Sequence, residues 1–423
     1  ADGEYYGSWY HYPKFNLKNF LKKKIDFIFI THTHPDHFSS KTLKLFDKNI
    51  PIIIHKFAFP FIKFNLQKIG FKHIIEIDHG KEFKLGKDFF IKIYAADDCD
   101  PKLCQSFFKC DFLKDKLGSQ QIDSLSVIYS KKHSIINVND CPFELSKKIV
   151  KKIKKDFKNI DVLLAGYSGA GPFPQCFLNQ YSLKKIKDLA EQKKKQFLQQ
   201  TLDFYNVIKP RYLMPFAGTY FLSSNLYSLN KYRGVPTPFQ ATQYFEKYLT
   251  KNLHKSKALL LDTNGWIDLD TNEIYLEQKK EKTKFDKKMK NYLKNKKLDY
   301  QKLPMPKNDV ILDLINRAKV NFFNKIQQKN VNSNTKILIE LQNNLIYCLD
   351  VKLKTGKYFN KNELKNLNNF VKLKLDQRLL KLILSGPKFA HWDNADIGSH
   401  ISYERKPDKF ERNINYALNF LHC

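Results

Sequence analysis

The sequence predicts an α/β fold in which apolar strands alternate with helices, and three observations support this. Short apolar runs, such as residues 51–54 and 162–165, have strand length and are too apolar for strands with one face in water. Amphipathic segments such as residues 144–157 separate them and have a helical period. A cluster of metal-binding side chains follows the apolar run 25–30, where the end of a strand could hold a site rigidly. Together these patterns predict helices packed in layers on sheets.

The predicted elements follow one another with short connections. Gly70 ends the helix predicted for residues 59–69, as glycine often does. A tight turn at residues 131–133 joins two neighbouring strands. The strands are expected at residues 25–30, 51–54, 73–77, 89–94, 125–129, 134–138, 162–165 and 212–214, and the helices at 41–46, 59–69, 144–157 and 183–205.

The chain is too long for one small core, and its composition changes along its length. We predict a metal-binding α/β domain at residues 1–270 and a lysine-rich linker at 271–308. Residues 309–423 then form a small α+β domain. Its predicted strands are 337–340, 345–351, 371–375 and 379–384, and its last helix is 407–421.

The composition indicates a soluble, cytoplasmic protein. The net charge of +32 invites a nucleic-acid interpretation, but lysine, asparagine, isoleucine and phenylalanine are all abundant while arginine is sparse. That joint bias is typical of AT-rich coding, so we expect lysine spread over the surface and no nucleic-acid partner. No run reaches about 18 apolar residues, which predicts no membrane span. The seven cysteines do not suggest a disulfide framework in a chain of this length.

The most informative segment is residues 31–40, THTHPDHFSS. It brings His32, His34, Asp36 and His37 together directly after a strand. Imidazole and carboxylate are the usual ligands of zinc, iron(II) and manganese(II), so the segment predicts a metal site. The alternative is a polar surface loop that happens to contain three histidines.

Asp140 follows the strand 134–138 and is the second candidate ligand. A carboxylate between two cations offsets their repulsion, so we expect Asp140 to bridge two metals. The alternative is an aspartate that caps the turn before Pro142. Asp36 is the candidate catalytic residue, since it could orient a nucleophilic water.

Three further segments are weaker candidates. Cys99, Cys104 and Cys110 could supply metal ligands, although their spacing matches no standard site and buried thiols are the simpler interpretation. The glycine-rich segment 166–174 contains Tyr167 and Ser168, which could line a substrate site or simply form a tight loop.

The polar and aromatic segment 388–400 is the third of these candidates. It contains His391 and His400, which could close over the metal site or belong to an ordered loop between domains.

The pattern His-X-His-X-Asp-His at residues 32–37, with its flanking strand and helix, resembles the metallo-β-lactamase superfamily. The resemblance implies an αββα sandwich whose first strands precede residue 1, so the domain would be truncated at its N-terminus. The superfamily also places a histidine before the strand pair that ends at the bridging aspartate, where this chain has only GSQQID at 118–123. A histidine is missing from YLMPFAG at 212–218 as well, so one metal held by His32, His34 and another ligand is favoured over a complete pair.

The longer pattern is similar to the CMP-N-acetylneuraminate hydroxylase family. The similar stretches are residues 30–40, 137–141, 162–173, 209–211, 215–218, 397–398 and 405–408, while 279–332 aligns poorly. The resemblance implies a sugar or nucleotide-sugar substrate, an anionic small molecule. That family also uses a Rieske domain, whose Cys-X-His and Cys-X-X-His ligands are absent here. An oxygenase would therefore need a separate Rieske or electron-transfer partner.

Two functions remain open from the sequence. The first is a metal-dependent enzyme, a hydrolase in the simplest case, with one or two zinc or iron ions held by His32, His34, Asp36, His37 and Asp140. The second is a degenerate binding protein for a sugar nucleotide, without metal chemistry. Nucleic-acid processing would be a third, but only the net charge supports it.

Overall fold

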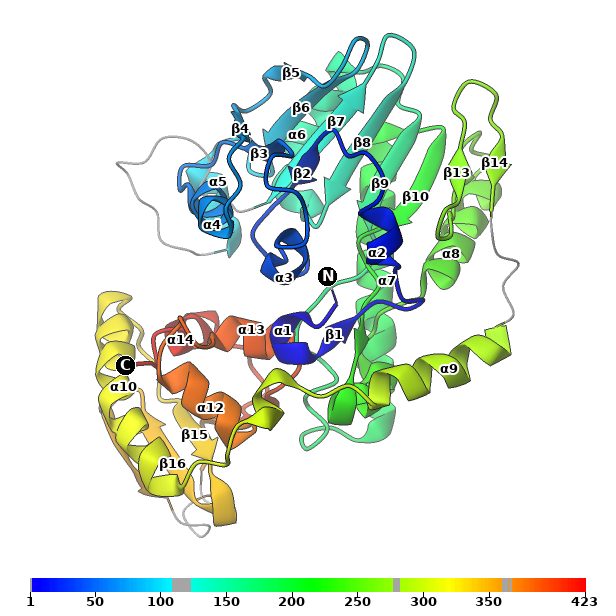
Figure 1. Ribbon diagram of the computed structural model, residues 1–423. Helices are drawn as coiled ribbons and strands as arrows, with labels where there is room; N and C mark the ends of the chain where they lie inside the picture. Colours follow the sequence, from blue (N-terminus) through cyan, green and yellow to red (C-terminus); the bar gives the residue numbers. More distant parts are fainter. Residues whose placement is uncertain (1, 109–122, 277–281, 360–363, 365–366) are drawn as a thin grey trace.

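The computed structural model describes residues 2–108, 123–276, 282–359, 364 and 367–423. Two sheets face each other in the N-terminal part of the chain (Figure 1). The larger is a mixed seven-stranded sheet of order β12-β10-β9-β8-β7-β6-β5, and the smaller is a parallel sheet of order β2-β3-β4. The strands are β2 (Ile28–Ile30), β3 (Ile52–His55), β4 (Ile74–Ile77), β5 (Glu82–Lys84), β6 (Phe90–Ala95), β7 (Ser124–Tyr129), β8 (Ser134–Asn139), β9 (Val162–Gly166), β10 (Tyr212–Phe216) and β12 (Lys257–Ala258).

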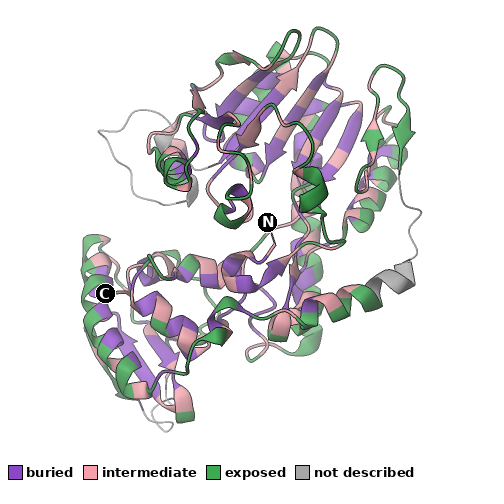
Figure 2. Cartoon of the chain, in the orientation of Figure 1, coloured by how far each residue is buried: buried purple, intermediate pink, exposed green. Residues whose placement is uncertain are grey.

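Three apolar clusters lie between the sheets and helices and so define four layers. Figure 2 shows buried residues along both sheets. Ile53 of β3 and Ile91 and Ile93 of β6 pack between the two sheets. Ile52 and Ile54 face α3 (Ser40–Leu43) and α4 (Phe61–Ile69) on the outer side of the small sheet. The large sheet packs its other face on α6 (Phe143–Asp156), α7 (Leu183–Ile208) and α8 (Pro238–Lys251). The predicted αββα sandwich is confirmed.

Local sequence explains where the outer helices begin and end. The side chain of Ser182 accepts a hydrogen bond from Lys185 N at the start of α7. Thr237 and Gln240 form a reciprocal capping box at the start of α8, where Pro238 is the first helical residue. Gly70 ends α4 in the left-handed region at φ 105°, as its position in the sequence predicted.

The C-terminal part has a five-stranded sheet of order β17-β16-β15-β18-β19. Its elements are α10 (Asn308–Gln328), β15 (Lys336–Glu340), β16 (Ile346–Asp350), β17 (Thr355–Phe359), β18 (Phe370–Lys374), α12 (Gln377–Leu384), α13 (Trp392–Ile397), β19 (Ser402–Lys406) and α14 (Arg412–Leu418). The strand predicted at 379–384 was wrong, because Asp376 caps a helix there and its apolar side chains pack at helical spacing. The last helix is shorter than the predicted 407–421.

The two parts share a hydrophobic core. Cys176, Phe177 and Ile186, from the segment before α7 and its first turn, pack in the same cluster as the C-terminal helices. Tyr5 in α1 (Glu4–Gly7) and Trp9 in β1 (Trp9–Tyr10) form another cluster with Tyr220 and β11 (Phe221–Leu222). This second cluster also contacts Ile397 of α13, so the N-terminal segment lies between the two parts (Figure 1).

The remaining elements are short or lie at the surface. The segment predicted as a lysine-rich linker contains α9 (Lys282–Lys294) and a 3-10 turn, η2 (Asp299–Lys302). The others are α2 (Leu17–Phe20), α5 (Pro101–Phe108), η1 (Ser224–Tyr232), β13 (Trp266–Ile267), β14 (Ile274–Tyr275) and η3 (Gln342–Asn344). Among the helices in the described ranges, none is both long enough and apolar enough to span a bilayer.

Candidate metal centre

The candidate centre lies where β2 and β8 end. The segment THTHPDHFSS leaves β2 after Ile30 and runs to α3, whose N-cap Ser39 accepts a hydrogen bond from Thr42 N. Asp140 directly follows β8, which ends at Asn139. Asn139 has φ 49°, a left-handed conformation that asparagine tolerates better than most residues. The metal-binding side chains thus stand on rigid strand ends.

The structure brings the five predicted ligands into two groups that share Asp140. His32, His34 and Asp140 form one group, and Asp36, His37 and Asp140 form the other. In each group, one ligand atom from every residue lies within 4.8 Å of the others. The shared carboxylate is therefore placed where a ligand that bridges two cations would stand.

Two neighbours hold the ring of His32, which is fully buried. Its Nδ1 lies 3.0 Å from Thr31 Oγ1 and 3.0 Å from the side-chain amide of Asn139. Its Nε2 is directed to the centre, 3.6 Å from Asp123 Oδ1 and 3.9 Å from Asp140 Oδ2. Burial and the neighbouring histidines lower the pKa of His32 well below its usual value, so the ring is neutral and can act as a ligand.

Asp123 was not predicted as a site residue. It directly precedes β7, which is antiparallel to β8, so the start of β7 lies beside the end of β8. Asp123 closes the GSQQID stretch, in which the sequence resemblance leads one to expect a histidine. The structure thus places a carboxylate beside His32 where the sequence showed only a missing ligand. The one available signal was an acidic residue immediately before a buried strand.

In the second group, His37 lies between two carboxylates. Its Nε2 is 3.3 Å from Asp36 Oδ2 and 3.3 Å from Asp140 Oδ2. Burial opposes the charge on His37, but the hydrogen bonds to Asp140 and Asp36 outweigh it and raise its pKa to about 10. The hydroxyl of Tyr5 donates to Asp36 Oδ1 at 2.6 Å, a contact that sequence reasoning did not predict.

The residues present fit a divalent metal. Among the described residues, the buried atoms His32 Nε2 and Asp123 Oδ1 have no hydrogen-bond partner, although they face one another. The carboxylates of Asp36 and Asp140 both approach Nε2 of His37, so a cation bound here would offset their negative charges. Imidazole nitrogen and carboxylate oxygen together suit zinc, iron(II) or manganese(II). His32, His34, Asp36, His37, Asp123 and Asp140 would hold the metal or metals.

Strand β10 contributes no residue to the ligand groups found in the described part of the chain, in agreement with the missing histidine in YLMPFAG. After β10 the chain turns through Ala217, at φ 50°, and Gly218. A Cβ at Gly218 would lie 2.6 Å from the ring of Tyr167, so the buried tyrosine occupies this corner. The hydroxyl of Tyr167 contacts Thr219, and Ser168 donates to the carbonyl of Gly218. Both predicted substrate residues therefore support this turn.

The two late histidines lie at the junction with the C-terminal part. His400 is buried, with Nδ1 3.0 Å from the hydroxyl of Tyr300 and Nε2 2.7 Å from the carbonyl of Tyr5. His391 caps α13 by accepting a hydrogen bond from Asp393 N. Neither belongs to the two ligand groups, but His400 supports the backbone of Tyr5, which in turn contacts Asp36.

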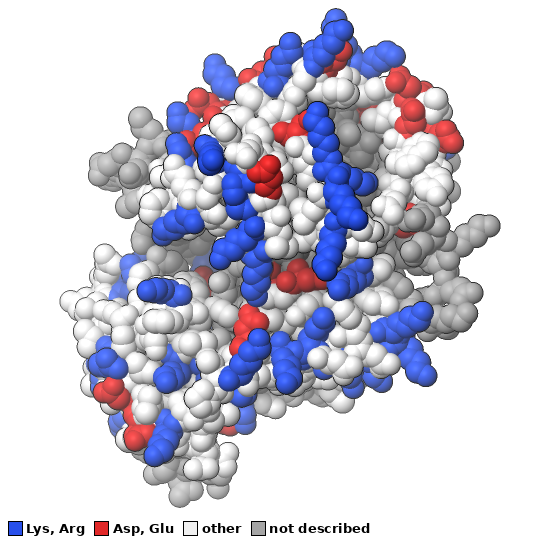
Figure 3. Space-filling model, in the orientation of Figure 1, with Lys and Arg blue, Asp and Glu red and all other residues white. Residues whose placement is uncertain are grey.

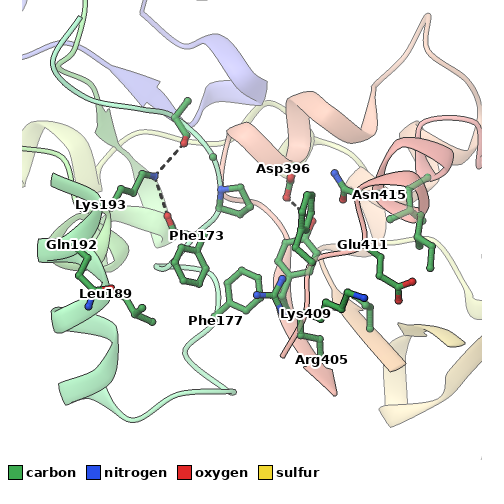
Figure 4. Close-up of a pocket in the computed structure, with 18 of the residues that line it drawn as sticks. Phe173, Phe177, Leu189, Gln192, Lys193, Asp396, Arg405, Lys409, Glu411 and Asn415 are labelled. Atoms are coloured by element: carbon green, nitrogen blue, oxygen red, sulfur yellow. Dashed lines mark hydrogen bonds between the residues drawn. The ribbon is translucent and has the colours of Figure 1, made fainter. Parts of the chain in front are cut away.

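A cavity of about 540 Å³ lies apart from the ligand groups, between α7 and the C-terminal part (Figure 4). Aromatic rings including Phe173, Phe177 and Tyr403 line it. Lys193 directs its ammonium group to the carbonyls of Ala170 and Phe173, at 3.1 and 2.9 Å. Residues 170–173 of the glycine-rich segment line the cavity, whereas Tyr167, Ser168, His391, His400 and the predicted metal ligands do not.

Comparison with known proteins identifies no family from sequence. No family model and no curated protein matches the chain. Among solved structures, CmlA, a diiron β-hydroxylase from Streptomyces venezuelae, is 14% identical with a TM-score of 0.38, over 59% of this chain and 46% of CmlA. An isothiocyanate hydrolase from Delia radicum gut bacteria is 14% identical with a TM-score of 0.36, over 58% of this chain and 76% of its own.

The metallo-β-lactamase fold protein YhfI from Bacillus subtilis is 11% identical, with a TM-score of 0.27, over 46% of this chain and 64% of its own. Since all three TM-scores are below 0.5, the fold assignment rests on the four layers described above.

Proposed function

We propose that this chain is a metal-dependent enzyme of the metallo-β-lactamase superfamily with a two-metal centre. His32, His34 and Asp123 would hold one ion, Asp36 and His37 the other, and Asp140 both. The observation that carries the proposal is the pair of ligand groups that share Asp140. With Asp123 beside His32, the first ion does not need the missing histidine.

The chemistry proposed is hydrolysis. A divalent metal lowers the pKa of a bound water to near neutrality and so provides a nucleophile. The protein contributes a fixed first group and a more open second group. His32 is fully buried, whereas the side chains of His37, Asp36 and Asp140 are 18%, 20% and 33% exposed. A substrate would thus approach from the side of Asp36 and Asp140, and Tyr5 fixes the carboxylate of Asp36 through a hydrogen bond to Oδ1.

We propose an anionic small molecule, a sugar or nucleotide sugar, as the substrate. The support is the sequence resemblance and the net charge of +32. Figure 3 shows Lys and Arg side chains spread over both parts of the molecule on one face, with fewer acidic ones. This distribution favours a general attraction of small anions over one continuous groove for nucleic acid.

One observation favours the alternative of a binding protein without metal chemistry. The turn after β10 holds the ring of Tyr167 and supplies no histidine, so the second ion would have only three protein ligands. An oxygenase is a further form of the enzyme proposal, in which the centre holds iron and a separate Rieske protein supplies electrons.

The test is elemental analysis combined with turnover. The purified chain is loaded separately with Zn²⁺, Mn²⁺ and Fe²⁺, freed of excess metal and incubated with CMP- and UDP-sugars. We expect about two equivalents of metal and release of a hydrolysis product. The variant H32A/H34A, correctly folded by circular dichroism, should lose both metal and turnover.

Two outcomes would contradict the hydrolase. Stoichiometric nucleotide-sugar binding without turnover, equal in the wild type and H32A/H34A, would establish the binding protein. Product formation only by the iron form, with oxygen and a reduced Rieske protein, would establish the oxygenase.

A further inference from the structure

A second cluster of metal-binding side chains lies outside the proposed centre and shares no residue with it. His55 is the last residue of β3, His79 follows β4, and Cys99 follows β6. One ligand atom from each lies within 4.8 Å of the other two. These segments are far apart in the sequence, and the packing of the two sheets brings them together (Figure 1).

His55 is the strongest element of this cluster. It is only 1% exposed, and neither ring nitrogen makes a hydrogen bond of ordinary geometry to a described residue, although the backbone of Ile77 lies close to the ring. Buried polar atoms in native proteins are nearly always paired with protein groups, water or an ion. An imidazole nitrogen with no ordinary hydrogen bond, set beside a second imidazole and a thiol, is a ready metal ligand.

His79 has a carboxylate that can orient it. Its Nε2 lies 3.1 Å from Asp98 Oδ1, and its Nδ1 accepts a hydrogen bond from Ala95 N at 3.1 Å. Lys148 lies 3.0 Å from the other oxygen of Asp98 and balances its charge. Metal-bound histidines commonly donate their second N–H to a carboxylate in this way. A metal at Nδ1 would replace the hydrogen bond from Ala95.

Cys99 completes the set from an unusual backbone conformation. Asp98 and Cys99 have φ values of 51° and 55°, so two consecutive residues that are not glycine adopt the left-handed region. Such conformations are sparsely populated and concentrate at functional sites. The turn places the thiol of Cys99 beside the two imidazoles, and Cys99 is partly exposed, which leaves an approach from solvent.

We propose that His55, His79 and Cys99 bind a zinc ion, independently of the centre at Asp140. Two imidazoles and one thiolate are a donor set that zinc accepts readily and that magnesium and calcium do not. On binding, the thiol of Cys99 loses its proton to solvent and its sulfur donates the lone pair. The three protein ligands leave a fourth position for water, and the ion ties the ends of β3, β4 and β6 together.

Cobalt(II) substitution tests this site separately from the first. A thiolate bound to cobalt absorbs in the near ultraviolet by charge transfer, and the proposed two-metal centre has no thiolate among its ligands. The metal-free chain of residues 1–423 is titrated with Co²⁺, and we expect this band in the wild type and in H32A/H34A. It should disappear in Cys99→Ala and His55→Gln, each of which should also bind one zinc fewer.

Matched controls separate Cys99 from two other thiols in the described part of the chain. Cys104→Ser and Cys141→Ser should both keep the band. Cys141 directly follows Asp140, so Cys141→Ser tests whether a thiolate beside the first centre gives rise to the band. Asp98→Asn should weaken cobalt binding about 10- to 100-fold, because it removes the carboxylate that orients His79. No charge-transfer band in the wild type would overturn the proposal. A band that persists in Cys99→Ala, or an unchanged zinc content in that folded variant, would do the same.

Discussion

Nε2 of His32 and Oδ1 of Asp123 face each other at 3.6 Å, both buried and both without a hydrogen-bond partner in the described part of the chain. The two residues are 91 positions apart, next to strands of different sheets. Leaving such a pair unsatisfied costs about 1–3 kcal/mol per group, and a metal between or beside them removes that cost. This pair therefore marks the more buried side of the proposed centre.

Replacing Asp123 tests whether it is a ligand. Asp123→Asn preserves the shape of the side chain and removes its negative charge, so we expect one equivalent of metal fewer by elemental analysis. Asp161→Asn is a suitable control, since Asp161 pairs with Arg211 at 2.9 Å, away from the ligand groups. Equal metal content in D123N and the wild type would remove Asp123 from the ligand set.

The shared position of Asp140 predicts unequal effects of two substitutions. His37→Ala removes a ligand of one group only, so the variant should keep about one equivalent of metal. Asp140→Asn removes the carboxylate common to both groups and should weaken both ions. Metal titration by calorimetry distinguishes the two variants. If D140N retained both ions at wild-type affinity, the two-metal assignment would fail.

Tyr5 should act through Asp36. Tyr5→Phe removes the hydrogen bond that orients this carboxylate, and loss of such a bond typically lowers metal affinity about 10- to 100-fold. The neighbouring Tyr6→Phe is the control, because the hydroxyl of Tyr6 contacts the backbone of His391 and not Asp36. The measurement is the Kd of the weaker ion, and similar values for the two variants would contradict the role of Tyr5.

Asp396 predicts a pH dependence of stability away from the centre. Burial raises its pKa to about 7, although Tyr403 donates a hydrogen bond that opposes the shift. The folded chain then keeps a proton that the unfolded chain releases near pH 4, so the free energy of unfolding falls as the pH rises from about 4 to about 7. The contribution is at most about 4 kcal/mol.

The matched variant is Asp396→Asn, which keeps an acceptor for Tyr403 and removes the titration. Chemical denaturation at pH 5 and pH 8 should show a smaller loss of stability in this variant than in the wild type. The exposed Asp393, on the same helix, also raises the pKa of Asp396, so Asp393→Asn should show a loss of stability between those of Asp396→Asn and the wild type. Parallel pH profiles for all three proteins would show that Asp396 is not the group responsible.

Two glycines predict opposite stability effects. Gly234 has φ +66°, and a Cβ there would lie 2.6 Å from the carbonyl oxygen of Ala190 in α7, so Gly234→Ala should cost about 2–4 kcal/mol. Gly86 has an ordinary φ and no atom within 4 Å of a Cβ, so Gly86→Ala should be neutral or stabilising by up to about 1 kcal/mol. Thermal unfolding measures both, and equal Tm values would contradict the argument.

Most of the α/β sandwich could be predicted because its strands are short, apolar and bounded by turn residues. The segment 379–384 was misassigned because its apolar run is as short as a strand, and periodicity alone does not separate the two cases. This segment is a helix because Asp376 caps its N-terminus and because Leu379 and Ile383, four residues apart, both pack in the core.

The residues of the candidate site also fall into some that the sequence predicts and some that it does not. His32, His34, Asp36 and His37 are recognisable because four potential ligands within six residues need a common partner, and Asp140 because it ends the expected strand. Asp123 and Tyr5 carry no comparable pattern. One is an isolated aspartate and the other a tyrosine 31 positions from Asp36, and only packing brings them to the centre.

By itself the sequence determined the layered α/β class and the position of the metal-binding segment, because both depend on residues close together in the chain. The tertiary structure decided how Asp140 is shared, that Asp123 stands beside His32, and that His55, His79 and Cys99 meet. These relationships depend on which strand ends lie at the same edge of the two sheets. That is set by strand pairing and core packing between distant segments, which local patterns do not encode.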